Sequence, residues 1–231
     1  MEKPVVDYRK FRLNKLGTDE FCHLKLLIYW AVFGIMFIFV ERVRVVDRYY
    51  VMHCGIDDVI PFCEYFLIPY LFWFVFIIGM LAYTLLYDIP AFRRMMYFIM
   101  TTYTIAIFVY LIFPNCQQLR PAEFVRDNIF TRFMRHFYEF DTNTNVCPSI
   151  HVIGSAAVCF TAMSIERFKT PGWSVFFTVA TFLICVSTMF LKQHSFIDVA
   201  AALPVCAVGY VVSFKKRKAS AARETADSGT A

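Results

Sequence analysis

The chain has 231 residues, of which 59% are hydrophobic and 18% are charged, and its formal net charge at pH 7 is +5. Soluble domains are about 45–50% apolar, so this composition leaves too little polar surface for a water-soluble globule. The apolar stretches use nearly the whole chain, so we expect no second folded domain. We predict no nucleic-acid partner, because basic loops in a membrane protein first of all set its topology.

The apolar stretches in chain order predict a membrane domain. Residues 1–23 are polar and read as an N-terminal cytoplasmic segment, and we expect no cleavable signal, because the first apolar stretch has the length of a span and no Ala-x-Ala-like site follows it. A bilayer core needs about 20 apolar residues in helical form. Six stretches qualify: 24–40, 65–87, 95–113, 149–165, 173–191 and 196–214. The expected fold is therefore an all-α bundle of six transmembrane helices over residues 24–214.

The distribution of Lys and Arg predicts the orientation. Residues 215–231 form a basic tail that we expect to be disordered. Basic residues are more frequent in this tail, in the N-terminal segment and in the loops on their side, which predicts that both termini are cytoplasmic in a multi-pass protein of the plasma membrane. Loops 41–64 and 114–147 then face outward, and so long a loop as 114–147 between spans is often functional.

Two motifs in this outward part of the chain are suited to a phosphate. Arg120-Pro121 follows the third stretch, and Pro148-Ser149-Ile150-His151 opens the fourth. Proline is favoured at the first helical position, and the unpaired amides of a helix start attract anions, so Ser149 and its neighbours could hold a phosphate. The planar guanidinium of Arg120 matches phosphate oxygens. His151, at the same mouth, could donate a proton to a leaving alkoxide.

The third motif comprises Ser187, His194 and Asp198, between the fifth and sixth stretches. His194 and Asp198 are four residues apart, which on a helix brings the carboxylate to the imidazole. The carboxylate can hold one ring nitrogen as a proton donor and leave the other free as a nucleophile. We expect this pair to be catalytic. Lys192, two residues before His194, is a further candidate phosphate ligand.

Taken together, the three motifs resemble those of the type 2 phosphatidic acid phosphatase superfamily, whose patterns are K-x6-R-P, P-S-x-H and S-R-x5-H-x3-D. The resemblance implies a six-helix membrane core in which His194 attacks phosphorus, Asp198 orients it and His151 protonates the leaving group. It further implies that Arg120 and Ser149 hold the phosphate and that no metal or cofactor is needed. The expected function is hydrolysis of a lipid phosphate or pyrophosphate through a phosphohistidine at the outer membrane surface.

Two positions depart from these patterns. Phe113 stands where the first motif has lysine, and Thr188 where the third has arginine. Each charged hydrogen bond is worth about 1.5–3 kcal/mol, so the loss disfavours a doubly charged monoester, and Lys192 would restore one charge. Relatives with fewer cations include lipid phosphotransferases of the inositol-phosphoceramide and sphingomyelin synthase type, which act on singly charged phosphodiesters. Such a transferase is therefore the first alternative, and a non-catalytic membrane scaffold of the same fold is the second.

Four of the eight cysteines are expected on the outward side, where disulfides persist. They are Cys54, Cys63, Cys116 and Cys147. Four cysteines allow three pairings, and one hypothesis joins Cys54 to Cys63 and Cys116 to Cys147.

Overall fold

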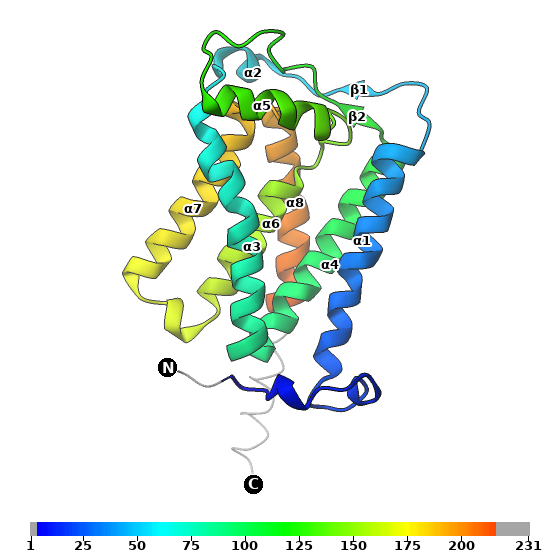
Figure 1. The fold of residues 1–231 in the computed structure, drawn as a ribbon, viewed down its shortest axis with the longest axis vertical. Helices are drawn as coiled ribbons and strands as arrows, with labels where there is room; N and C mark the ends of the chain where they lie inside the picture. Colours follow the sequence, from blue (N-terminus) through cyan, green and yellow to red (C-terminus); the bar gives the residue numbers. More distant parts are fainter. Residues whose placement is uncertain (1–3, 216–231) are drawn as a thin grey trace.

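The structure, a computed structural model, describes residues 4–215. It is a helical bundle capped at one end by loops, two short helices and a two-stranded sheet (Figure 1). The helices are α1 Ile28–Ile38, α2 Gly55–Val59, α3 Leu67–Tyr87, α4 Ile89–Ile112, α5 Ile129–Phe140, α6 Ile150–Met163, α7 Pro171–Phe190 and α8 Phe196–Tyr210. Short 3₁₀ and π turns add Tyr8–Lys10, Leu13–Lys15, Cys22–Leu27, Phe39–Val43, Glu64–Phe66, Glu166–Phe168 and Val211–Lys215.

Five helical segments of the described chain are long and apolar enough to cross a membrane, which indicates a multi-pass membrane protein. They are Cys22–Val43, Glu64–Tyr87, Ile89–Ile112, Pro171–Phe190 and Phe196–Lys215. Each corresponds to one of the six predicted stretches. The largest difference in bounds is at α4, which begins at Ile89 rather than residue 95. Asp88 caps this earlier start, since its carboxylate accepts a hydrogen bond from the Ala91 amide at 2.8 Å.

The remaining predicted stretch, 149–165, which is the fourth in chain order, forms the shorter helix α6. Its 14 residues span about 21 Å at 1.5 Å per residue, less than the roughly 30 Å of a bilayer core. The helix lies in the middle of the bundle in contact with α3, α4, α7 and α8 (Figure 1), and eight of its residues are buried. Because other helices surround it, α6 does not need the length of a span.

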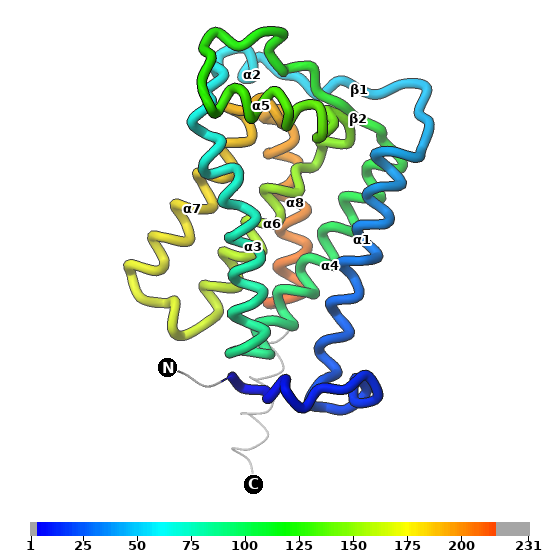
Figure 2. The backbone as a smooth tube through the Cα atoms, viewed as in Figure 1, coloured from blue at the N-terminus to red at the C-terminus, as the bar shows by residue number. Residues whose placement is uncertain are grey.

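The capping end of the bundle is built from the two segments that the sequence analysis placed in outward loops. Strands β1 (Tyr50–Val51) and β2 (Asn115–Cys116) pair in parallel, with Tyr50 opposite Asn115. From β2 the chain runs over this end and returns as α5, which lies across it (Figure 2). Buried side chains of α5 and α3, including Met134, Leu67 and Tyr70, pack into a small apolar cluster with Leu191. The cap is therefore packed onto the bundle.

The first described residues and the end of α8 lie at the opposite end of the bundle from this cap (Figure 1). The two ends of the described chain thus share one end of the bundle, and the cytoplasmic placement of the termini stays a prediction. Of the basic tail predicted at 215–231, only Lys215 lies within the described residues.

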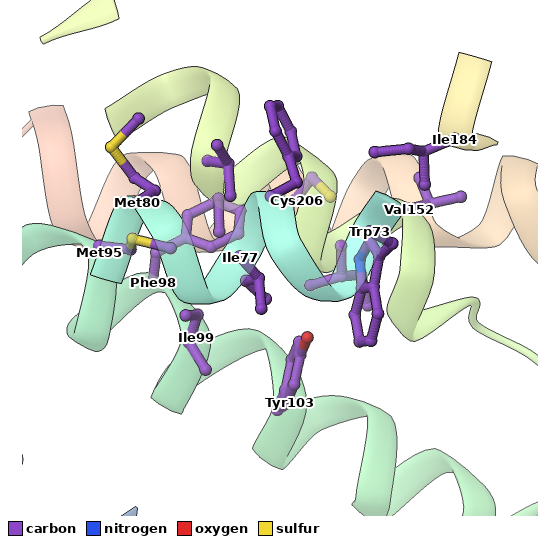
Figure 3. Close-up of a cluster of buried hydrophobic side chains, with 14 of the residues drawn as sticks. Trp73, Ile77, Met80, Met95, Phe98, Ile99, Tyr103, Val152, Ile184 and Cys206 are labelled. Atoms are coloured by element: carbon purple, nitrogen blue, oxygen red, sulfur yellow. The ribbon is translucent and has the colours of Figure 1, made fainter. Parts of the chain in front are cut away.

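The core of the bundle is formed mainly by buried side chains of α3, α4, α6, α7 and α8 (Figure 3). In this view Trp73 and Ile77 of α3 lie near Tyr103 and Ile99 of α4, with Val152 of α6 beside them. Helices α4 and α8 approach each other so closely at one point that only glycine, which has no side chain, fits there. At Gly209 of α8 a Cβ atom would lie 2.4 Å from Thr102 Cγ2 and 2.9 Å from the Phe98 ring.

This close approach predicts that Gly209→Ala destabilises the protein by about 1–3 kcal/mol, the usual cost of overpacking a close-packed interior. The matched control is Gly79→Ala in α3, where a Cβ would meet no described atom within 4 Å and alanine favours helix. Thermal unfolding of both variants in detergent measures the difference. Equal midpoints for the two variants would contradict the packing described for α4 and α8.

Candidate active site

His194 and Asp198 meet at the start of α8, beneath the cap. His194 Nδ1 lies 3.2 Å from Asp198 Oδ2, and both side chains are buried. The same carboxylate oxygen accepts a hydrogen bond from the Ser195 amide at 2.9 Å, while Ser195 caps the helix through the Ile197 amide. The predicted contact is present, since the carboxylate holds Nδ1 and leaves Nε2 available. The spacing predicted that both residues lie on one helix, but His194 precedes the N-cap Ser195 and does not lie on the helix with Asp198.

The loop before α8 fixes the backbone of His194. The carbonyl of Thr188 accepts hydrogen bonds from the amides of Gln193 and His194, at 2.9 and 3.1 Å. The hydroxyls of Ser187 and Thr188 donate to carbonyls within their own helix, α7. Both side chains are fully buried. Thr188 thus serves the site through its main chain, at the position where the family pattern has arginine.

His151 lies on α6 opposite His194. The two imidazole rings are 5.6 Å apart between centroids, in an edge-to-face arrangement. The His151 ring packs against Tyr70 and Trp73 of α3, at centroid distances of 4.6 and 4.5 Å. Its Nδ1 has no hydrogen-bond partner within residues 4–215. The structure thus brings together two histidines that are far apart in the sequence.

The start of α6 is anchored by residues outside the motifs. Asn115 of β2 binds both the amide and the carbonyl of Cys147, at 2.7 and 2.9 Å, and Tyr110 donates to the Pro148 carbonyl at 2.7 Å. Ser149 is the N-cap, so Pro148 precedes the cap and does not occupy the first helical position. The Ser149 amide donates to the Asp198 carbonyl at 3.1 Å, which joins the start of α6 directly to α8.

The Ser149 side chain remains a candidate phosphate ligand. It is fully buried, and its hydroxyl has no hydrogen-bond partner in the described part of the chain.

Arg120 lies close to the site but is bound to the protein. Its guanidinium donates to the carbonyls of Tyr138, Asp141 and Thr142, at 2.9–3.0 Å, and to the side-chain oxygen of Gln193 at 2.6 Å. It also stacks over the Tyr138 ring. Burial lowers the pKa of Arg120, although the Asp141 carboxylate opposes that shift. In this arrangement Arg120 joins the end of α5 to the loop that carries His194.

The other predicted cation, Lys192, points toward α2. Its ammonium donates to the carbonyls of Asp57 and Ile60, at 2.8 and 2.5 Å, and burial lowers its pKa. Phe113, at the position of the family lysine, stacks on Tyr50 with ring centroids 4.5 Å apart. The structure therefore does not bring Lys192 or Phe113 to the histidine pair.

Asp57 of α2 is a site residue that the sequence analysis missed. Its carboxylate accepts hydrogen bonds from the Ser195 hydroxyl at 2.6 Å and from the Phe196 amide at 2.8 Å, as well as from the Cys54 amide. Burial would raise the pKa of Asp57, but these hydrogen bonds outweigh it and hold the pKa below its ordinary value. Asp57 fixes the helix start next to His194, and no local pattern in residues 55–59 points to that role.

A polar cavity of about 40 Å³ lies beside the histidine pair. Its lining includes His151, His194, Glu41, Asp141, Asn145 and Gln193. Burial raises the pKa of Asp141, and the neighbouring Arg120 opposes that shift. The cavity lies at the capped end of the bundle, and its walls come from the first span, α4, the start of α6, the α5–α6 loop and the α7–α8 loop.

All eight cysteines lie within the described residues, and none of them forms a disulfide. The hypothesis that joined Cys54 to Cys63 and Cys116 to Cys147 is therefore not supported. The segments that it would have linked are held by hydrogen bonds instead, among them those from Asn115 to Cys147.

Comparison with protein-family models, with curated proteins and with solved structures finds no match to this chain.

Proposed function

We propose that this chain is a membrane enzyme that cleaves a lipid phosphate ester through a phosphohistidine on His194. One observation supports this most strongly: His194 has Nδ1 against the Asp198 carboxylate at 3.2 Å while the His151 ring lies 5.6 Å from its own ring, at the edge of a polar cavity. The proposal includes membership of the type 2 phosphatidic acid phosphatase superfamily, with α6 as the sixth helix of the membrane core.

The proposed reaction has two steps. In the first, His194 Nε2 attacks phosphorus, a P–N bond forms, and the P–O bond to the leaving group breaks. His151 gives its proton to the departing oxygen. In the second step His151 takes a proton from water, whose oxygen attacks phosphorus and breaks the P–N bond. Asp198 stabilises the positive charge that develops on His194, as the buried carboxylate of a catalytic triad does.

Hydrolysis of a lipid phosphate or pyrophosphate, without a metal or other cofactor, is the form of this reaction that we propose first. We place it at the extracytoplasmic surface of the plasma membrane, because the Lys and Arg distribution favours cytoplasmic termini and the cavity lies at the opposite end of the bundle from the described ends.

Transfer to a lipid alcohol is the second candidate, and the environment of the cavity favours it. The guanidinium of Arg120 and the ammonium of Lys192 bind backbone carbonyls, whereas the carboxylates of Glu41 and Asp141 line the cavity. Carboxylates near a dianionic phosphate monoester repel it more than they repel a singly charged phosphodiester. In this candidate reaction a lipid hydroxyl replaces water in the second step.

A non-catalytic scaffold is the competing proposal from another class. A buried and hydrogen-bonded His–Asp pair facing a second histidine has no evident use in a scaffold, since burying ionisable groups is costly. Catalytic assays distinguish the two directly.

The test is a substrate panel for the purified full-length protein in mixed micelles with a chelator present. The panel comprises phosphatidic acid, phosphatidylglycerol phosphate, undecaprenyl diphosphate and a phosphodiester lipid, each with and without added diacylglycerol or ceramide. We expect turnover of at least one lipid and, with a radiolabelled phosphate ester, an acid-labile phosphoryl group on His194. Turnover that requires the added alcohol would select the transferase. No turnover and no labelling for every lipid would reject the enzyme proposal.

A further inference from the structure

The cavity beside the histidines contains polar groups that the proposed phosphoryl chemistry does not use. Asn145 and Gln193 are only 5% and 3% exposed and both line the cavity. Three of their side-chain atoms have no hydrogen-bond partner within residues 4–215: Asn145 Oδ1, Asn145 Nδ2 and Gln193 Nε2. Leaving a buried polar group without a partner is unfavourable, so these groups indicate a ligand.

Glu41 adds a carboxylate oxygen to this set. Its Oε2 accepts hydrogen bonds from the hydroxyls of Thr142 and Thr144. Its Oε1 is buried and without a partner in the described part of the chain, and the residue lines the cavity. The threonines thus hold the carboxylate in one orientation and leave one oxygen for a ligand.

Gln193 is oriented in the same way by Arg120. The guanidinium donates to Gln193 Oε1 at 2.6 Å, which leaves the side-chain amide nitrogen as a donor. Apart from His151 Nδ1, the unpartnered groups of the described residues around the cavity are therefore two acceptors, Glu41 Oε1 and Asn145 Oδ1, and two donors, Asn145 Nδ2 and Gln193 Nε2. No Lys or Arg is among the described residues that line it.

This mixture of groups indicates the chemistry of the ligand. A phosphate presents only acceptors to its surroundings at neutral pH, and it would face two carboxylates here. The two carboxylates would attract a quaternary ammonium, but such a group has no hydrogen-bond donor for Asn145 Oδ1 and no acceptor for the amide donors Asn145 Nδ2 and Gln193 Nε2. A hydroxyl both donates and accepts, and a neutral hydroxylated group can therefore satisfy carboxylate, carbonyl and amide together.

We propose that this cavity binds the hydroxyl groups of an uncharged polyol head group, of the glycerol or inositol type, with Glu41, Asn145 and Gln193 as its ligands. The inference rests on the second candidate for the proposed function, which acts on a phosphodiester, and specifies its substrate as a singly charged phosphodiester whose ester oxygen lies between His151 and His194. The cavity volume of about 40 Å³ is roughly that of three water-sized oxygen positions. The cavity therefore has room for the head-group hydroxyls nearest the phosphate but not for a complete inositol ring.

The variant that tests this proposal is Glu41→Gln. The glutamine keeps the size of the side chain, and its carbonyl can still accept from Thr142 and Thr144. The amide nitrogen then replaces the free carboxylate oxygen in the cavity. Glu139→Gln is the matched control, because Glu139 is exposed on the outer face of α5.

The measurement is kcat/KM for phosphatidylinositol and phosphatidylglycerol relative to phosphatidylcholine. We expect the wild type and the Glu139→Gln variant to prefer the polyol lipids. In Glu41→Gln we expect the ratio of kcat/KM for the polyol lipids to kcat/KM for phosphatidylcholine to fall roughly tenfold or more, because KM for the polyol lipids rises. An equal loss on all three lipids in Glu41→Gln, or a wild-type preference for phosphatidylcholine, would overturn the proposal.

A second pair of variants tests Asn145 while keeping its backbone. Asn145 has φ of +51°, a conformation that glycine and aspartate tolerate. We expect Asn145→Gly to lose polyol preference and Asn145→Asp, which retains an acceptor, to lose less. Equal preference in the two variants would count against Asn145 as a ligand.

One further measurement separates failure of this inference from failure of the proposed function. If the wild type turns over none of the lipids, the proposed function fails, and binding is then read from the unfolding midpoint of the protein with myo-inositol or with choline chloride. A stabilisation by myo-inositol that Glu41→Gln abolishes would retain the polyol site without the enzyme. No stabilisation would reject both.

Discussion

Replacing His194 with alanine is expected to lower turnover of the best lipid substrate by at least about 10⁴-fold, the scale of losing a nucleophile from a group that acts as a unit. The variant lacks the imidazole nitrogen that would attack phosphorus. No other described histidine has both its Nδ1 held by a carboxylate and its ring facing a second histidine that could protonate a leaving group. Initial rates in chelator, with matched protein concentrations, measure the effect. Asp198→Asn tests the carboxylate that orients His194, and we expect it to lower turnover by about 10²–10⁴-fold.

The control for these variants is His136→Ala. This histidine is on α5, with its side chain 83% exposed, and we expect its loss to leave turnover unchanged. Unfolding midpoints for all three variants distinguish loss of chemistry from loss of fold. Wild-type rates in a folded His194→Ala protein would rule out the phosphohistidine mechanism.

The largest expected effect on stability comes from Asp57→Ala. The substitution leaves the Ser195 hydroxyl and the amides of Phe196 and Cys54 without their acceptor. Because these hydrogen bonds go to a buried charged group, we expect their loss to lower the free energy of unfolding by about 3–5 kcal/mol. The neighbouring Asp58→Ala is the matched control, because Asp58 is 64% exposed and pairs with His53 at the surface. It should change stability by less than about 0.5 kcal/mol.

The pH dependence of the Asp57 contribution follows from the direction of its shift. The folded-state pKa is below the ordinary value, so the contribution is fully present above the unfolded pKa of about 4 and is lost as pH falls through the folded pKa. The gap in unfolding midpoint between wild type and Asp57→Ala should therefore be constant near neutral pH and shrink below about pH 4. A gap that grows on acidification would contradict the description of Asp57 as an ionised acceptor.

The residues nearest His194 show which parts of the site could be predicted. The contact between His194 and Asp198 joins two residues four apart across the start of α8, where His194 lies just before the N-cap Ser195, and it is a local property of the chain. The meeting of His194 with His151 depends on how α6 packs against α8, which the motif order alone does not determine. Arg120 and Lys192 were assigned to phosphate because of their charge, yet the folded chain supplies carbonyl acceptors to both.

The amino-acid sequence by itself determined the membrane helices and their order, because a segment in a bilayer must satisfy its backbone hydrogen bonds internally and needs an apolar length that can be counted. Tertiary structure alone decided that α6 is short and enclosed, that Asp57 holds the start of α8, and that Glu41 faces the histidines from the first span. Each of these depends on contacts between segments far apart in the chain, and such contacts are set by packing and by the competition of nearby acceptors for each donor.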